Sequence, residues 1–184
     1  MLNKLRRKLR EREGSSMIEF AMALFIFVIV TAFIVDMLFV GHKRFLIARE
    51  TTDISRTLAV QGGVASAVPV GYPGGDRAYL TSKELYLKLD DTMSGANIER
   101  DEWSVKLTEY NTSGEIIRNI QLTPQTSFKI DYMNSMDIEI DATYNWKLMR
   151  IITAGALDEA GVGAKRHAVS EFKYNFDEWE GEGY

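Results

Sequence analysis

The sequence predicts an α+β protein with a long N-terminal transmembrane helix, followed by a short helix and an antiparallel sheet of about four strands. Three observations lead to this fold class. An almost unbroken apolar run covers residues 17–40, a stretch rich in Gly and Pro follows residue 61, and apolar and polar residues alternate beyond residue 103. The 184 residues include no Cys, so the fold has to be held by its core without disulfides.

The apolar run is the first element. It extends from Met17 to Val40 and is interrupted by Glu19, Thr31 and Asp36. As a helix it is about 36 Å long, which exceeds the hydrocarbon thickness of about 30 Å. A cleaved secretory signal is the rival interpretation, but such signals have an apolar region of about 7–15 residues and a small-residue site after it. Because no such site follows Asp36, the run predicts a membrane-spanning helix.

The charge distribution predicts how this helix is oriented. Residues 1–14 hold six Lys or Arg and two Glu, which gives this segment a charge of +4. Because the net charge of the whole chain is −4, the rest of the chain carries −8. Cationic flanks stay on the cytoplasmic side. We therefore expect a single-pass protein of the cytoplasmic membrane, with the N-terminus inside and an acidic domain outside. An acidic domain also lacks the basic patch that nucleic-acid binding requires, so we expect no nucleic acid as a partner of the head.

The helical pattern continues beyond the membrane segment. Residues 42–60 lack Gly and Pro and repeat apolar residues at helical spacing, which predicts one helix from about Ser16 to Gln61, ended by Gly62 and Gly63. Residues 62–80 are expected to form a Gly/Pro linker. A capping-box pattern, Thr81-Ser82-Lys83-Glu84, then opens a short helix that closes at Gly95.

The strands are predicted from alternation. Trp103 to Thr108 and Ile116 to Leu122 fit a hairpin around a turn at 111–114, and Met136 to Trp146 is the clearest strand. A last strand is expected over residues 167–176. Residues 148–166 fit either a helix or a mobile loop.

The junction between the basic leader and the apolar run carries the most specific pattern. Residues 13–20 read Glu-Gly-Ser-Ser-Met-Ile-Glu-Phe. A Gly at position 14, a small residue at Ser15 and an acid at Glu19 resemble the processing site of type IV prepilins. The pair Glu19-Phe20 resembles the TadE-like minor pseudopilins of tight-adherence (Tad) pilus systems. The similarity covers roughly residues 10–45.

The resemblance implies four parts of the chain. Residues 1–14 are a basic prepilin-type leader, 15–61 a transmembrane helix continuing into a pilin-like spine, 62–80 the linker, and 81–184 an extracytoplasmic α+β head. The implied function is that of a minor pilin or pseudopilin in a Tad-like type IV pilus or a related secretion filament, cleaved after Gly14. The implied partners are the cytoplasmic membrane, a prepilin peptidase, other pilin or pseudopilin subunits and the assembly platform.

Two departures from the resemblance set its limits. Major Tad pilins are much shorter and usually carry Glu-Tyr where this chain has Glu19-Phe20, which favours a minor or tip subunit over a subunit of the shaft. The alternative function is a permanently anchored extracytoplasmic binding or sensor domain whose helix never leaves the lipid.

Glu19 is the predicted assembly residue. A carboxylate within an apolar helix costs about 2.5–3.5 kcal/mol on insertion scales, so it requires a partner or a place near the interface. Cleavage after Gly14 would create a cationic amine at Ser15. The resemblance implies that Glu19, beside Phe20, neutralises this amine on an adjacent subunit. The alternative is that Glu19 lies among lipid headgroups and complements the helix dipole.

Asp36 is the second acid of the apolar run. It is expected either to extend outward to the interface or to pair with a Lys or Arg of a neighbouring helix in a filament. Asp36 follows Glu19 by 17 residues. At 100° per residue the two acids lie on different faces and cannot form one site.

The sequence predicts no catalytic residue, no cofactor and no metal. His42 and His167 lack metal-ligand spacing. Asp137, Glu139 and Asp141 share one strand face, which fits a solvated surface or, with a loop's help, a calcium site. No nucleophile, base and orienting group occur at spacings that indicate an enzyme.

Overall fold

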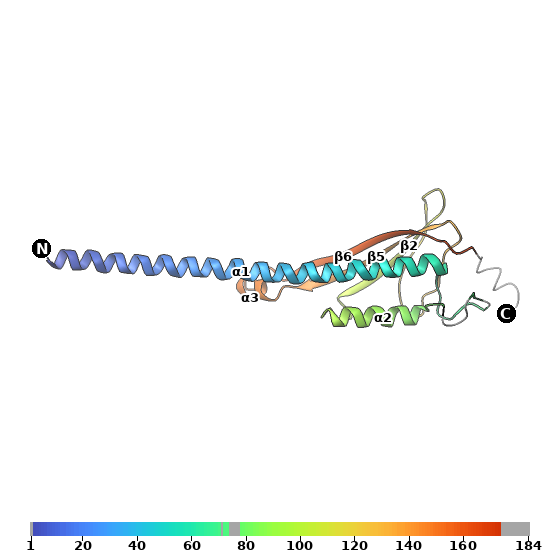
Figure 1. Ribbon diagram of the computed structural model, residues 1–184, viewed down its shortest axis with the longest axis horizontal. Coiled ribbons are helices and arrows are strands. Elements are labelled where there is room, and N and C mark those ends of the chain that lie inside the picture. The colour runs from blue at the N-terminus through green and yellow to red at the C-terminus, as the bar shows by residue number, and fades with distance from the viewer. Residues whose placement is uncertain (1, 71, 74–77, 174–184) are drawn as a thin grey trace. The chain divides into compact units, whose positions relative to one another are not determined.

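The described part of the chain is α+β, with one long helix, two shorter helices and two sheets (Figure 1). A computed structural model describes residues 2–70, 72–73 and 78–173, with side chains from Ser16 onward. The elements in chain order are α1 (Leu2–Gln61), β1 (Gly63–Val64), α2 (Ser82–Gly95), β2 (Trp103–Tyr110), β3 (Ile116–Gln121), β4 (Phe128–Lys129), β5 (Ser135–Asn145), α3 (Leu148–Ile152) and β6 (Glu159–Val169). The predicted fold class, with its long apolar helix, short helix and antiparallel strands, is confirmed at this level.

The chain divides into two compact units. The first comprises the described residues up to Phe39 together with Asn145–Glu159, and the second comprises the described residues of 40–144 and those from Ala160 onward. Helix α1 contributes to both units. Its C-terminal end is the predicted one, because Gly62 follows it with a φ of 76°, a left-handed conformation that Gly adopts at little cost. Its start, Leu2, precedes the predicted one, in a leader rich in good helix formers.

The four-stranded sheet belongs to the second unit. Its strand order is β3-β2-β5-β6, with β2 antiparallel to both β3 and β5. Val105 faces Ile140 and Leu107 faces Ile138 across the β2–β5 ladder, and all four side chains are buried. The alternation predicted for the strand after residue 135 is confirmed, since Met136, Ile138, Ile140, Ala142 and Tyr144 are all buried. This apolar face is the core side of the sheet.

Two helices pack core residues in the second unit. The part of α1 beyond Val40 buries Ile47, Ile54 and Leu58 at helical spacing, and α2 buries Leu85, Leu89 and Met93. Helix α2 begins with the predicted capping box. The Glu84 backbone N–H donates to Thr81 Oγ1 at 3.3 Å, and the Thr81 N–H donates to Glu84 Oε2 at 2.9 Å. Hydrogen bonds from Thr81 lower the pKa of Glu84.

A buried lysine joins α1 to the end of α2. Lys43 is 7% exposed, and its Nζ donates to the carbonyl oxygen of Asn97 at 2.8 Å. The same ammonium lies 4.9 Å from the ring centroid of Tyr144 on β5. Asn97 has a φ of 58° just after α2. Lys43 therefore neutralises the carbonyl end of α2, where a cation is favourable.

The prediction for the last strand was wrong in its position. Strand β6 covers Glu159–Val169 rather than residues 167–176; Tyr174 and Phe176 lie outside the described residues. Val162 is the one β6 residue that is buried, so the strand shows little alternation. Gly163 also hid it. A Cβ there would lie 2.9 Å from Asp141 Oδ1 and 3.0 Å from Ile140 O, so a glycine permits the close approach of β5.

The predicted linker contains one short strand. Within residues 62–80, β1 pairs antiparallel with β4, matching Val64 to Phe128. Two-residue strands carry no alternation that a sequence can reveal.

Candidate functional site

The N-terminal part of α1 is apolar on all sides. Fifteen large apolar side chains between Met17 and Phe39 are exposed. A helix that is apolar all round cannot bury itself in one small domain, which has only one face to offer. The segment Ser16–Gln61 is the one helix in the described part of the chain that is long and apolar enough to cross a membrane.

The predicted processing and assembly residues lie at the start of this segment. Gly14 and Ser15 are helical in α1, and their side chains are outside the described set. Glu19 and Phe20 are exposed, Phe20 to 69%. The 17 residues from Glu19 to Asp36 correspond to about 26 Å along the helix axis. The structure therefore keeps the two acids apart, as their spacing predicts.

Asp36 is fully buried, at 0% exposure, and caps helix α3. Its Oδ2 accepts the backbone N–H of Leu148 at 3.0 Å and that of Met149 at 2.8 Å. The residue that precedes α3, Lys147, makes no capping bond with its own side chain. The expectation that Asp36 extends outward was thus wrong. The backbone N–H groups in the first turn of a helix have no partner within the helix, so they can satisfy a buried carboxylate as a cation can.

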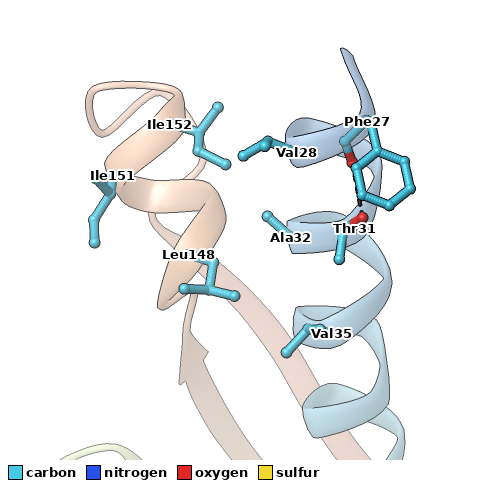
Figure 2. Close-up of a pocket in the computed structure, with 8 residues that line it drawn as sticks. All are labelled: Phe27, Val28, Thr31, Ala32, Val35, Leu148, Ile151 and Ile152. Carbon is cyan, nitrogen blue, oxygen red and sulfur yellow. Dashed lines mark hydrogen bonds between the residues drawn. The ribbon is translucent and has the colours of Figure 1, made fainter. Parts of the chain in front are cut away.

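Next to this cap, α1 and α3 form an apolar groove of about 330 Å³ (Figure 2). It is lined by five residues of α1 and three of the α3 region: Phe27, Val28, Thr31, Ala32, Val35, Leu148, Ile151 and Ile152. Figure 2 shows Val28, Ala32 and Val35 directed toward α3, whereas Ile151 points away from α1. Ala32, 7% exposed, lies one turn before Asp36, and its small side chain lets α3 approach closely. We call this feature the α1–α3 groove.

The segment around α3 is closed by its own contacts. The rings of Phe33 and Trp146 stack with centroids 6.4 Å apart and planes 15° apart. The Trp146 N–H donates to the Asp158 carbonyl at 2.9 Å. Arg150 Nε pairs with Asp158 Oδ1 at 2.8 Å. Contacts within the first unit therefore join the two ends of the segment, Trp146 and Asp158, and pair its charged residues Arg150 and Asp158.

Leu148, Ile151 and Ile152 were not predicted as members of a site. The sequence contained an indication of this contact in each of the two segments. Asp36 required a partner inside an apolar run, and residues 148–152 place four apolar side chains, with one arginine, between two strands. The predicted partner was a Lys or Arg of a neighbouring helix, and two backbone N–H groups of α3 are partners that the sequence did not indicate.

A polar cluster lies on the sheet of the second unit. Asp137 Oδ2 accepts hydrogen bonds from Tyr110 Oη at 2.7 Å and Lys165 Nζ at 2.8 Å, and Oδ1 lies 2.8 Å from His167 Nδ1. Burial acts to raise the pKa of Asp137, but the hydrogen bonds from Lys165, Tyr110 and His167 outweigh it and lower that pKa. The hydrogen bond to Asp137 raises the pKa of Lys165 and that of Tyr110.

Asp137 is one of the three acids, with Glu139 and Asp141, that were considered as a calcium site on β5. Asp137 uses both carboxylate oxygens within the protein, so it is not a ready calcium ligand. Among the residues whose placement is described, no group of three or more His, Cys, Asp or Glu is arranged to hold a metal ion. Of the three acids on this strand face, Asp137 is held by pairing within the protein, and Asp141 is exposed.

The fold and the site together define a chain with one exposed apolar helix segment and an α+β domain. Comparisons with protein-family models, curated proteins and solved structures found no match. A functional assignment therefore rests on the chain's own residues.

Proposed function

We propose that this protein is a minor pilin-like subunit of a Tad-like type IV filament or related secretion filament. It is inserted in the cytoplasmic membrane with its N-terminus inside, cleaved after Gly14 by a prepilin peptidase, and then assembled with other pilin or pseudopilin subunits at an assembly platform. The observation that carries the proposal is the junction at residues 13–20, where Gly14, Ser15 and Glu19 stand between a basic leader and an apolar run.

The environment of this junction supports the proposal. Helix α1 continues without a break through Gly14 and Ser15 into the apolar segment. Phe20 and the apolar residues after it are exposed on all sides of the helix. Such a surface requires lipid before assembly and neighbouring apolar helices afterwards. One surface thus serves both states of a filament subunit.

The role of Glu19 follows from charge. Cleavage after Gly14 places a cationic amine one helical turn from Glu19, because Ser15 and Glu19 are four residues apart. Near an apolar core, where the effective dielectric is low, an unpaired carboxylate is unfavourable and a paired one is tolerated. The resemblance to type IV prepilins implies the pairing that we propose, in which Glu19 of one subunit neutralises the new terminus of an adjacent subunit and sets the register between them.

The decisive experiment is mass spectrometry of the mature N-terminus from sheared surface filaments, in cells that contain the peptidase. We expect a chain that begins at Ser15. Gly14→Leu should block cleavage, whereas Gly41→Ala is the matched control in the same helix, because a Cβ at Gly41 meets no atom within 4 Å. Filaments that contain intact Met1 would exclude the proposal.

A second measurement distinguishes the proposed filament subunit from a permanently anchored binding or sensor domain. Glu19→Gln should abolish or strongly reduce incorporation into filaments while leaving membrane insertion intact. Asp53→Asn is the control, because it neutralises an exposed acid on α1 of the second unit. A permanently anchored binding or sensor domain predicts an uncleaved leader and full function with Glu19→Gln.

A further inference from the structure

We propose that the α3 segment, residues 146–158, is itself seated in the lipid bilayer, and that acyl chains occupy the α1–α3 groove. The inference rests on the proposed membrane span of α1. It adds a second, non-spanning membrane element contributed by a part of the chain far from the N-terminus.

The level of the groove along α1 is the first argument. At 1.5 Å per residue, Val35 and Val28 lie about 8 and 18 Å from Val40, the end of the apolar run. A hydrocarbon core is about 30 Å thick, so a span ending near Val40 places the groove inside this core, from about 8 Å below its edge to just past the midplane at about 15 Å. The groove is continuous with the exposed apolar surface of α1, and what covers that surface covers the groove.

The exposed side of α3 is the second argument. Ile151 is 77% exposed and points away from α1 (Figure 2). In the described part of the chain, no large apolar side chain outside α1 is more exposed. Leu148 and Leu157 add further apolar exposure to the same segment. Water does not favour this arrangement, whereas an acyl environment does.

The backbone of the segment is the third argument, because lipid does not tolerate irregular chain with unsatisfied polar groups. Asp36 accepts the first two N–H groups of α3. At the other end, the N–H groups of Thr153, Ala154 and Gly155 donate to the carbonyls of Met149, Ile151 and Arg150. The Leu157 N–H donates to Thr153 Oγ1. The turn after α3 is therefore largely self-satisfied.

The charges of the segment fit lipid better than a protein partner. The segment carries three charged residues. Arg150 and Asp158 pair with each other at 2.8 Å, which lowers the cost of carrying them near hydrocarbon, and Lys147 is exposed at the start of α3, where its long side chain can extend toward the headgroups. A second copy of the chain docking here would gain apolar contact but would meet a charged pair already satisfied internally.

The test is depth-dependent fluorescence quenching on the full chain. Because the sequence contains no Cys, one introduced cysteine gives one labelled position. Ile151→Cys is the test position, Ile26→Cys on the apolar segment is the lipid reference, and Ile116→Cys on β3 is the aqueous reference. These isoleucines are all well exposed, at 77%, 59% and 62%. Each variant carries an environment-sensitive fluorophore in vesicles of phosphatidylcholine and phosphatidylglycerol.

We expect the label at 151 to be quenched by nitroxide groups on lipid acyl chains, as at 26, and to be several-fold less accessible to iodide than at 116. Leu157→Cys repeats the test at a second position. If iodide reaches 151 as readily as 116 while 26 stays protected, the inference is overturned and the span stands. If iodide reaches 26, the span and with it the proposed function fail. Protection of 151 from both quenchers, with cross-linking between copies on oxidation, would assign the groove to a second copy.

Discussion

The two parts of α1 belong to the same helix but meet opposite surroundings. Among the described side chains up to Phe39, Ala32 and Asp36 are buried, and both face α3. Beyond Val40 the helix buries a regular series of residues against the domain: Lys43, Ile47, Thr51, Ile54, Ser55, Leu58, Ala59 and Gln61. The more apolar part of the helix is the more exposed one.

This difference shows that an apolar side chain is not necessarily a buried one. The second part of α1 mixes polar residues with a stripe of apolar ones, so a single face can be buried while the rest meets water. The first part has no polar face to give to water. Under the proposed function, lipid or neighbouring helices cover this exposed apolar surface, and mutations should affect the two parts differently.

The largest expected effect tests this comparison directly. Leu58→Ala removes a fully buried side chain and should lower the free energy of unfolding of the domain by about 2–5 kcal/mol. Leu24→Ala, the matched change in the apolar part, removes a side chain that is 52% exposed and should change it by less than about 0.5 kcal/mol. Urea denaturation of the full chain in nanodiscs, followed by tryptophan fluorescence, measures both. Equal losses would show that Leu24 is also a core residue.

The next effect sharpens the boundary between the two parts. Lys43→Met keeps the apolar stem but removes the ammonium that donates to Asn97 O and lies over Tyr144. Because a hydrogen bond to a charged group contributes about 1.5–3 kcal/mol, we expect a loss of that size in unfolding free energy. The neighbouring Arg44→Met is the control, since Arg44 is exposed. The same denaturation assay applies, and a loss equal to that of the control would show that Lys43 only fills space.

Much of this molecule could be predicted from its sequence where one local rule decided the structure. The end of α1 at Gly62, the capping box at Thr81 and the strand beginning near Met136 were each fixed by residues adjacent in the chain. The features that were missed depend on distant partners. Asp36 and Leu148 are 112 residues apart, and Gly163 makes sense only beside β5. Burial of Lys43 likewise depends on Asn97, which no local pattern connects to it.

The third prediction concerns the one buried acid of the apolar part. Asp36→Ala removes the acceptor of two α3 N–H groups, and loss of a helix cap costs about 0.5–2 kcal/mol. We expect the amides of Leu148 and Met149 to exchange hydrogen about 2- to 30-fold faster, since 1.4 kcal/mol is a factor of ten. Asp36→Asn keeps an acceptor oxygen and should restore much of the protection. Asp53→Ala is the exposed control, and unchanged exchange in Asp36→Ala would contradict the capping role.

The smallest effect compares Asp36 with an aspartate of the second unit. Asp137 lies in a cluster with Tyr110, Lys165 and His167 whose hydrogen bonds lower its pKa in the folded state. A lowered folded-state pKa means that the unfolded chain binds the proton more tightly in acid. The contribution of Asp137 to stability is therefore present above its ordinary pKa and is lost as the pH falls through the folded-state value. Because Lys165 and His167 are half exposed, the contribution should be under about 1 kcal/mol.

Asp137→Asn should accordingly flatten the fall of unfolding free energy on acidification and leave the hydrogen exchange of α3 unchanged, because the cluster and the Asp36 cap belong to different units. Asp141→Asn, an exposed acid on the same strand, should keep the wild-type slope. Denaturation curves at several acidic pH values, combined with exchange of the Met149 amide, measure both readouts on one sample. If Asp137→Asn released α3 as Asp36→Ala does, the two aspartates would be acting on one shared element, and the separation between the lipid-facing and the water-facing parts of this molecule would have to be abandoned.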